Sequence, residues 1–119
     1  MPDVSTGKTG EEFIKELLLE KGYKFVCSNF KCRFGEIDVI VRDDRYIVFV
    51  EVKTRKKGSL VNPFEAITPS KQKKIIRTAE YYLLKNPSKL QPRFDAAAVT
   101  TDDGRIVSAD YLTDAFRIN

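Results

Sequence analysis

The chain has 119 residues, enough for one ordinary domain with a hydrophobic core but not for two. Hydrophobic residues make up 42% of it and charged residues 32%, which is typical of a soluble globular protein. No apolar run approaches the roughly 20 residues that cross a bilayer, and the start lacks a signal-peptide pattern, so we expect a cytoplasmic protein without a membrane partner. The absence of histidine excludes Ser-His and Cys-His nucleophilic schemes. Any catalysis must therefore rest on carboxylates, lysine and a metal ion.

The first predicted element is a helix over residues 10–21, with Thr6 or Thr9 as its candidate cap. Its apolar stripe consists of Ile14, Leu17 and Leu18. Glu11 lies on the same side of the helix as this stripe. A glutamate in a first turn is also an ordinary partner for the helix dipole, so spacing alone leaves the role of Glu11 open.

A short strand over residues 23–26 and a polar connection over residues 29–34 come next. They lead to a predicted antiparallel hairpin. Residues 36–41 alternate charged and apolar side chains, whereas residues 46–52 are almost entirely β-branched or aromatic. The two strands are joined by a polar turn around residues 43–44.

The predicted hairpin register gathers charge on one face. A two- or four-residue loop centred on residues 43–44 gives the pairs Ile40 with Ile47, Asp38 with Phe49, and Glu36 with Glu51. Because side chains alternate faces, Asp38, Glu51 and Lys53 share a face, and Asp38 lies diagonal to Glu51, within reach of a shared ion. The opposite face is wholly apolar: Ile37, Val39, Val41, Val48, Val50 and Val52. Unpaired buried ions are costly, so a bound cation explains three such charges more simply than three separate structural accidents.

The second half of the chain is predicted to add one helix and one hairpin. A loop over residues 58–70 leads to a helix over residues 68–85, whose inward face begins with Gln72. Strands over residues 93–100 and 105–111 form the hairpin. The element order is α-β-β-β-α-β-β. It predicts a single α/β domain over the whole chain, a mixed β-sheet flanked by helices.

Asp38 and Glu51 are the candidate metal ligands and catalytic carboxylates. Mg²⁺, or Mn²⁺ in its place, takes one or two carboxylates together with waters and substrate phosphate oxygens. The backbone carbonyl of Val52 is a further candidate ligand, because it lies between two site residues. Such an ion would polarise a phosphate and lower the pKa of a bound water. Lys53 lies about 7 Å beyond Glu51 along the strand. The two carboxylates favour its ammonium form, so we expect Lys53 to orient water and stabilise phosphate charge.

The net charge of +4 hides a strong segregation. Residues 53–77 hold eight basic residues against one acid, a net charge of +7, which leaves −3 for the rest of the chain. A segment of this charge attracts a polyanion, and we expect the partner to be nucleic acid, in particular DNA. The candidate binding residues are Arg55, Lys56, Lys57, Lys71, Lys73, Lys74 and Arg77. The alternative is a loop and an exposed helix that lysine keeps soluble.

One family resemblance covers nearly the whole chain. The signature of the YraN-type family of predicted endonucleases resembles two segments here, Gly35-Glu36-Ile37-Asp38-Val39-Ile40 and Phe49-Val50-Glu51-Val52-Lys53-Thr54-Arg55. Further matches are Gly7-x-x-Gly10-Glu11, Gly22-Tyr23, Asn29 and Arg93-Phe94-Asp95. That family is similar to the restriction-endonuclease-like PD-(D/E)xK nucleases and to archaeal Holliday-junction resolvases. One departure is Ile14, where the family usually carries a smaller alanine, and it affects packing more than chemistry.

The resemblance implies a fold and a set of roles. It implies a restriction-endonuclease-like core in which the metal ligands are Glu11, Asp38 and Glu51 and the catalytic lysine is Lys53. Lys71 matches a family lysine that would contact phosphate. Glu36 fits the family pattern without a settled role there, and we keep it, together with Gln72, as an accessory candidate.

Three functions remain open from the sequence. The first is a magnesium- or manganese-dependent endonuclease acting on branched or structured DNA in repair or recombination, for which a homodimer would suit a two-fold substrate. The second is a non-catalytic nucleic-acid-binding module on a nuclease fold. The third is an interaction scaffold in which the acids pair with Arg33, Arg55 or Lys53. We favour the first, because a retired site has little reason to keep Asp38, Glu51 and Lys53.

Overall fold

Two helices flank a five-stranded mixed sheet in the computed structural model, which describes residues 8–118. The helices are α1 (Gly10–Glu20) and α2 (Pro69–Lys85), and a short 3-10 helix, η1 (Pro63–Ala66), precedes α2. The strands are β1 (Lys24–Cys32), β2 (Gly35–Arg42), β3 (Tyr46–Lys56), β4 (Gln91–Asp102) and β5 (Arg105–Phe116). They lie in sequence order, antiparallel except for the parallel pair β3–β4. The predicted α/β class is confirmed, and the arrangement is compatible with a restriction-endonuclease-like core.

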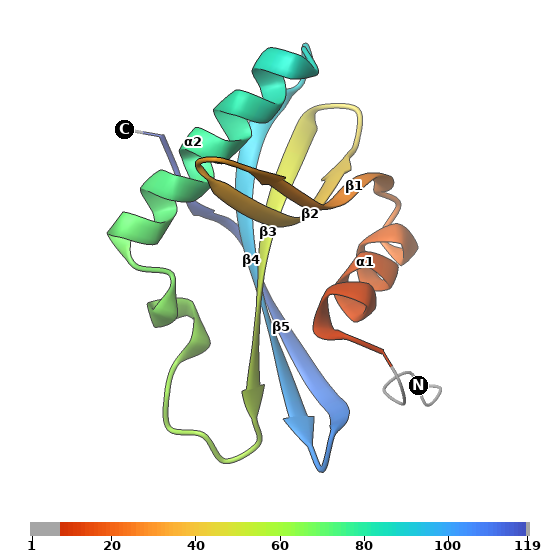
Figure 1. Cartoon of the computed structure of the whole chain (residues 1–119). Helices are drawn as coiled ribbons and strands as arrows, with labels where there is room; N and C mark the ends of the chain where they lie inside the picture. The colour runs from red at the N-terminus through yellow and green to blue at the C-terminus, as the bar shows by residue number, and fades with distance from the viewer. Residues whose placement is uncertain (1–7, 119) are drawn as a thin grey trace.

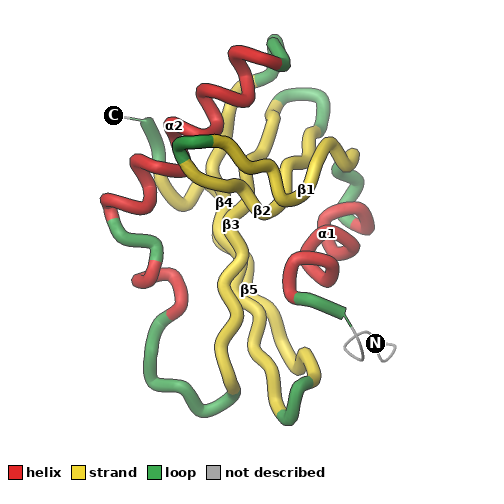
Figure 2. The backbone as a smooth tube through the Cα atoms, in the orientation of Figure 1, coloured by secondary structure: helices red, strands yellow, loops and turns green. Residues whose placement is uncertain are grey.

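The two helices cover opposite faces of the sheet (Figures 1 and 2). The core on the α2 side includes Ile40, Phe49, Ile75, Ala79, Tyr82 and Phe94. The core on the α1 side includes Phe13, Ile14, Leu18, Val39, Val41, Val48 and Val50. Within residues 8–118, neither helix is both long enough and apolar enough to cross a membrane.

One residue of the predicted apolar face lies on the other side. Ile37 packs in the α2-side core rather than with Val39 against α1. On the N-terminal side of Val39, β2 pairs with β1, and Phe30 of β1 lies opposite Ile37. Phe30 meets Tyr82 of α2 edge-on, with ring centroids 5.0 Å apart, so Phe30 and Ile37 share the α2 side of the sheet.

Side-chain caps determine where both helices begin. The Thr9 hydroxyl accepts a hydrogen bond from the Glu12 backbone N–H at 3.1 Å, and the Glu12 carboxylate accepts one from the Thr9 N–H at 3.2 Å, which completes a capping box. Thr68 caps α2, and Pro69 occupies its first turn. Of the two candidate caps for the first helix, Thr9 is confirmed. Thr6 lies outside the described residues, as does Gly7 of the family motif.

Several elements are longer than their sequence patterns predict. β1 continues from Lys24 to Cys32, through most of the expected polar connection, because an edge strand needs no unbroken apolar face. β4 and β5 also extend beyond the predicted strands. The expected loop over residues 58–70 contains η1, which packs against β3 and β4. These differences leave the predicted element order intact.

A largely buried ion pair within β4, between Arg93 and Asp95, anchors hydrogen bonds that reach β5. Asp95 has no exposed surface, and its two carboxylate oxygens each accept a hydrogen bond of 2.9 Å from the guanidinium of Arg93. The Tyr111 hydroxyl and the Asp114 backbone N–H also donate to Asp95, at 2.6 and 2.9 Å. A third hydrogen bond from Arg93 reaches the Tyr23 hydroxyl at 2.7 Å. Asp95 is thus buried with its charge compensated, which assigns it a structural role.

We therefore expect Asp95→Asn to lower the free energy of unfolding by about 3–5 kcal/mol, because it leaves Arg93 buried without its counter-ion. Urea unfolding measures this loss. Asp110→Asn, at an exposed position of the same β5, is the matched control and should change stability by no more than about 0.5 kcal/mol. Equal effects of the two substitutions would contradict the structural role.

Candidate functional site

Strands β2 and β3 bring Asp38 and Glu51 to adjacent positions. The β2–β3 pairing that begins at the turn ends with Val39 opposite Val50. The next residues along the two strands are Asp38 and Glu51. The predicted pairing of Asp38 with Phe49 is therefore wrong by two residues. The two carboxylates lie closer together than the predicted diagonal arrangement would place them.

The register differs because the turn is centred one residue later than predicted. The Asp43 carboxylate accepts hydrogen bonds from the backbone N–H groups of Arg45 at 2.8 Å and Tyr46 at 2.7 Å, and the Asp43 N–H donates to the Tyr46 carbonyl at 3.0 Å. Ile40 consequently lies opposite Phe49. A shift of two residues preserves the alternation of faces, so the predicted acidic face survives the wrong register.

Asp38 is a buried carboxyl that faces another carboxyl. Only 6% of it is exposed, and its Oδ2 accepts a hydrogen bond of 2.7 Å from the Val52 N–H. The pKa of Asp38 is raised from its ordinary value of 3.8 to about 7. Burial is the largest cause, followed by hydrogen bonding to Glu51 and by the charges of Glu51 and Glu36. The Val52 N–H acts in the opposite direction. Asp38 is therefore partly protonated at neutral pH, chiefly because burial disfavours its charged form.

Lys53 supplies positive charge to only part of this site. Its ammonium lies 3.5 Å from Oε2 of Glu51, and both side chains are largely shielded, with 27% of Lys53 and 15% of Glu51 exposed. The predicted grouping of Asp38, Glu51 and Lys53 on one side of the hairpin is present in the structure. No ion pair joins Lys53 to Asp38 among the described residues.

The backbone of Val52 is aimed at the same place. Its N–H donates to the side chain of Asp38 instead of to a neighbouring strand. In an extended strand, the N–H and C=O of one residue point to the same edge. The Val52 carbonyl therefore faces the side of β3 on which Asp38 lies, the position expected of a backbone ligand.

Glu11 is near the site but is held by another residue. Its carboxylate accepts a hydrogen bond of 2.6 Å from the side-chain amide of Asn29. Asn29 lies between the β1 residues that pair with Val39 and Ile37, and hence next to Asp38 across the strands. Within residues 8–118, no three carboxylate or thiol side chains are close enough to hold one ion. The structure thus brings Asp38 and Glu51 together and links Glu11 to them through Asn29.

Asn29 is the site neighbour for which residue chemistry gave no role. Its backbone φ of 52° is in the left-handed region, which asparagine tolerates better than most residues. The sequence signal for Asn29 is its match to the family pattern. Only the pairing of β1 with β2 places Asn29 next to Asp38.

Glu36 is at the margin of the site. The predicted pairing of Glu36 with Glu51 is wrong, because Glu36 lies opposite Lys31 of β1, and its carboxylate is 3.7 Å from the Lys31 ammonium. Both side chains are more than half exposed. Glu36 contributes to the site as a nearby negative charge that helps to raise the pKa of Asp38.

The donor atoms of the Asp38–Glu51 pair fit a divalent cation with hard oxygen preferences. The two carboxylates are adjacent and partly shielded from water, and burial together with the neighbouring Glu51 raises the pKa of Asp38. A cation between them would favour the ionised form of both. The carboxylates, the Val52 carbonyl and solvent provide the oxygen ligands that Mg²⁺ and Mn²⁺ prefer.

The predicted basic residues lie on α2 and at the end of β3. The exposed ones are Lys56, Lys57, Lys71, Lys73, Lys74 and Arg77. Lys74 packs near Gly35, which precedes Asp38 by three residues, about 10 Å along the strand. The basic face of α2 therefore adjoins the start of β2 and the acidic site.

Two of the predicted polar residues instead hold loops in place. Arg55 is half-buried and donates to the Thr100 hydroxyl at 3.2 Å and to the Val61 carbonyl at 3.3 Å. The Gln72 side-chain amide donates to the Ile67 carbonyl at 3.0 Å, which secures the turn before α2. Both side chains therefore have a structural role.

The turn between β1 and β2 adds one basic residue, Arg33, to the basic surface. The guanidinium of Arg77 lies 4.5 Å from the ring centroid of Phe34, and that of Arg33 lies 4.9 Å from the same ring. Arg33 is exposed and lies outside the basic segment over residues 53–77. The basic surface is therefore assembled from two parts of the chain.

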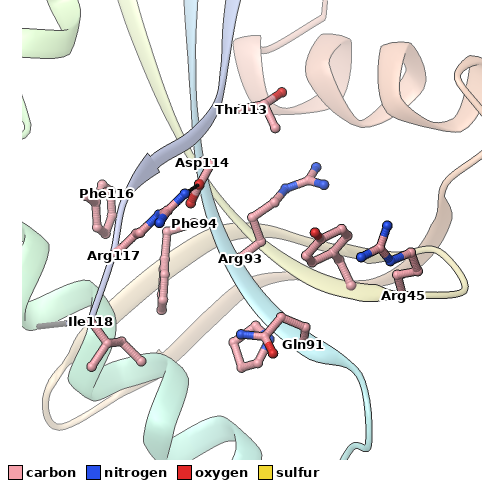
Figure 3. Close-up of a pocket in the computed structure, with 11 residues that line it drawn as sticks. Arg45, Gln91, Arg93, Phe94, Thr113, Asp114, Phe116, Arg117 and Ile118 are labelled. Atoms are coloured by element: carbon pink, nitrogen blue, oxygen red, sulfur yellow. Dashed lines mark hydrogen bonds and ion pairs between the residues drawn. The ribbon is translucent and has the colours of Figure 1, made fainter.

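A cavity of about 750 Å³ lies at the other end of the sheet (Figure 3). It is formed where β3 and β4 begin and β5 ends, and its lining includes Arg45, Tyr46, Arg93, Asp114, Arg117 and Ile118. Tyr46 precedes Glu51 by five residues, about 17 Å along β3. Arg93 and Arg117 are paired with Asp95 and Asp114. We place the candidate chemistry at the carboxylate pair, where charge is under-compensated, rather than in this cavity.

Comparison with known proteins gives one consistent result. The profile of a family described as "Uncharacterised protein family UPF0102" matches residues 10–99. The UPF0102 protein of Chlorobium phaeobacteroides (strain BS1) is 44% identical over 117 residues, which cover 92% of each chain. The UPF0102 protein of Clostridium perfringens (strain 13 / Type A) is 40% identical over 116 residues, covering 96% of this chain and 95% of that one. The matched residues include every member of the acidic site.

The raised pKa of Asp38 predicts a pH-dependent loss of stability. A carboxyl that binds its proton more tightly in the folded protein destabilises the fold as it ionises: the penalty is absent below about pH 4 and complete above about pH 7. In metal-free buffer at pH 8, Asp38→Asn should therefore be more stable than the wild type, with about 4 kcal/mol as the upper bound. Urea unfolding across this pH range measures the difference.

The control for this experiment is Asp44→Asn, which alters an exposed acid in the β2–β3 turn. It should follow the pH dependence of the wild type. Parallel stability curves for the wild type and Asp38→Asn from pH 4 to pH 8 would contradict the raised pKa.

Proposed function

This chain belongs to the uncharacterised protein family UPF0102, and we propose that it is a metal-dependent endonuclease that hydrolyses phosphodiester bonds in branched or structured DNA. The observation that carries the proposal is the pair of adjacent carboxylates, Asp38 and Glu51, with Lys53 next to Glu51 and a basic helix face nearby. The proposal places the chain among the PD-(D/E)xK nucleases. Asp38, Glu51-Val52-Lys53 and the mixed sheet support that placement.

The residues divide the work between binding and chemistry. Asp38 and Glu51 would hold Mg²⁺ or Mn²⁺, with the Val52 carbonyl as a backbone ligand. When bound, the ion supplies Lewis-acid polarisation of the scissile phosphate and a more acidic water. Glu11 joins from the first turn of α1 by releasing the amide of Asn29.

Lys53 acts beside the ion rather than as a base. Its ammonium is 3.5 Å from Glu51 and remains next to the site, where it orients the attacking water and stabilises negative charge on the phosphate. Lys71, Lys73, Lys74 and Arg77 hold the DNA backbone along α2, joined by Arg33 from the β1–β2 turn. Substrate phosphates thus approach from the basic face of α2 toward the carboxylates.

We expect the purified protein to cut branched or flapped DNA when Mn²⁺ or Mg²⁺ is added, and to stop when EDTA removes the ion. Asp38→Asn and Glu51→Gln should each reduce the cleavage rate by at least about 100-fold, and Lys53→Ala by a similar factor. Gel electrophoresis of end-labelled substrates measures the rates. Asp44→Asn, whose carboxyl lies outside the site, should cut like the wild type.

Two outcomes would overturn the catalytic proposal. One is the absence of cleavage across duplex, flapped and four-way substrates with either ion. The other is cleavage that survives Asp38→Asn and Glu51→Gln, which would identify a contaminating nuclease.

A second candidate function is a DNA-binding module that does not cut. The observation that favours it is the contact between Glu11 and Asn29, which keeps a third carboxylate from joining Asp38 and Glu51 in a single ligand group within residues 8–118. Both candidates predict electrostatic DNA binding, and only the first predicts metal-dependent product.

The basic surface predicts how DNA binding depends on salt. Lys73→Ala with Lys74→Ala should weaken binding and reduce the slope of log K against log salt concentration by about 2, because each phosphate contact contributes about 0.9 to the slope. Fluorescence anisotropy over a salt series measures the slope. The matched control is Lys24→Ala with Lys89→Ala, two exposed lysines near the opposite end of β3, which should leave the slope unchanged. Equal slopes for both double variants would contradict a basic surface on α2.

A further inference from the structure

The chain leaves β3 through a projecting loop, residues 57–62, which we call the tip loop. Figure 1 shows β3 running to the lower end of the molecule beside the β4–β5 hairpin, from which the chain turns and returns toward α2. The tip loop is attached to that hairpin, because the Lys57 N–H donates to the Thr101 carbonyl at 2.6 Å. It follows directly from the strand that carries Glu51 and Lys53.

Hydrogen bonds hold the tip loop in a defined shape. The Ser59 N–H donates to the Lys56 carbonyl at 3.1 Å, and the Ser59 hydroxyl accepts from the Val61 N–H at 3.3 Å. Arg55 reaches forward from β3 to the Val61 carbonyl at 3.3 Å. At the far end, the Asn62 side chain caps η1 by accepting from the Phe64 N–H at 3.0 Å.

Two adjacent apolar side chains stand out from this loop. Leu60 is fully exposed and Val61 is 64% exposed, although the backbone that presents them is fastened at several points. Because both side chains are exposed, they contribute little to the stability of the fold. The hydrogen-bonded loop thus holds two neighbouring apolar side chains in solvent, where an external partner can reach them.

The small exposed area of Leu60 and Val61 indicates what kind of partner can cover them. Two side chains are far too few for a stable protein–protein interface, which buries roughly 800 Å² on each side. They match an apolar wedge, which proteins insert between neighbouring base pairs to unstack them. Lys56, exposed at the end of β3, provides positive charge for the flanking phosphates, whereas Lys57 is 3.9 Å from Asp102 and partly neutralised.

We propose that Leu60 and Val61 form a wedge that enters DNA at an interruption of the base stack, such as a nick or a branch point. This inference rests on the proposed DNA-directed function and specifies the substrate feature that is recognised. An intact duplex must be unstacked before a wedge can enter, whereas a nick or branch is already interrupted there. The wedge therefore favours interrupted DNA over continuous duplex.

The covalent connection to β3 limits where the cut can fall. Leu60 is seven residues from Lys53, so the two are separated by at most about 25 Å. At about 3.4 Å per base pair, the scissile bond lies within about seven base pairs of the interruption.

The test compares two DNA probes under conditions that prevent cleavage. One is a short duplex with a nick and 2-aminopurine beside it, and the other is the same duplex without the nick. In buffer with EDTA, the wild type should bind the nicked probe about tenfold more tightly and increase its 2-aminopurine fluorescence by unstacking. Leu60→Ala with Val61→Ala should reduce this preference to less than about twofold while affinity for the intact duplex is unchanged.

The matched control is Leu84→Ala, which removes an equally simple side chain, 75% exposed, from the end of α2. It should keep both the preference and the fluorescence increase. A double variant at the tip loop that keeps them, or that loses affinity for both probes equally, overturns the wedge. So does a loss of self-association on gel filtration in the double variant without any change in DNA binding, since it assigns the loop to a second copy of the chain.

The outcomes separate this inference from the proposed function. Metal-dependent cleavage with no effect of the tip-loop substitutions retains the endonuclease and rejects the wedge. A nick preference that depends on Leu60 and Val61 in a protein that never cuts supports the wedge and the non-catalytic module. Failure to bind either probe overturns both.

Discussion

The parallel pairing of β3 with β4 is the constraint on which the rest of the structure depends. It runs from Tyr46 opposite Gln91 to Lys56 opposite Thr101. Two parallel neighbours cannot be joined by a tight turn, so the chain must cross over, and η1 with α2 provides that crossover. The crossover covers one face of the sheet and α1 covers the other. Residues 47–50 are consequently buried on both faces, which accounts for their unbroken apolar run.

The candidate site lies where this double coverage ends. Val50 is buried, whereas the next three residues, Glu51, Val52 and Lys53, are only partly so. Charge at that boundary is shielded enough to raise the pKa of Asp38, while Glu51 and Lys53 keep part of their surface exposed. The crossover that buries the strand also carries the basic residues of α2. One connection thus builds the core and places positive charge next to the carboxylates.

Two buried aspartates in this fold, Asp95 and Asp38, differ in how the protein compensates their charge. Asp95 has no exposed surface and receives four hydrogen bonds, two of them from the Arg93 guanidinium, so its charge is compensated within the protein. Asp38 receives one backbone N–H and faces Glu51, a like charge. The first arrangement stabilises the join between β4 and β5. The arrangement at Asp38 favours the binding of positive charge, and sites that bind metal or substrate are commonly built in this way.

The sequence by itself determined the element order, the α/β class, the approximate positions of both helices, and the face shared by Asp38, Glu51 and Lys53. These follow from local periodicity and capping, and the face survived a two-residue error in register because side chains alternate with period two. Tertiary structure alone decided the register itself, the movement of Ile37 to the α2 side, the contact of Asn29 with Glu11, and the addition of Arg33 to the basic surface. Each of these depends on a contact between segments far apart in the chain or on the hydrogen bonds of one turn. Spacing along the chain fixes which way a side chain points, but only packing fixes what it meets.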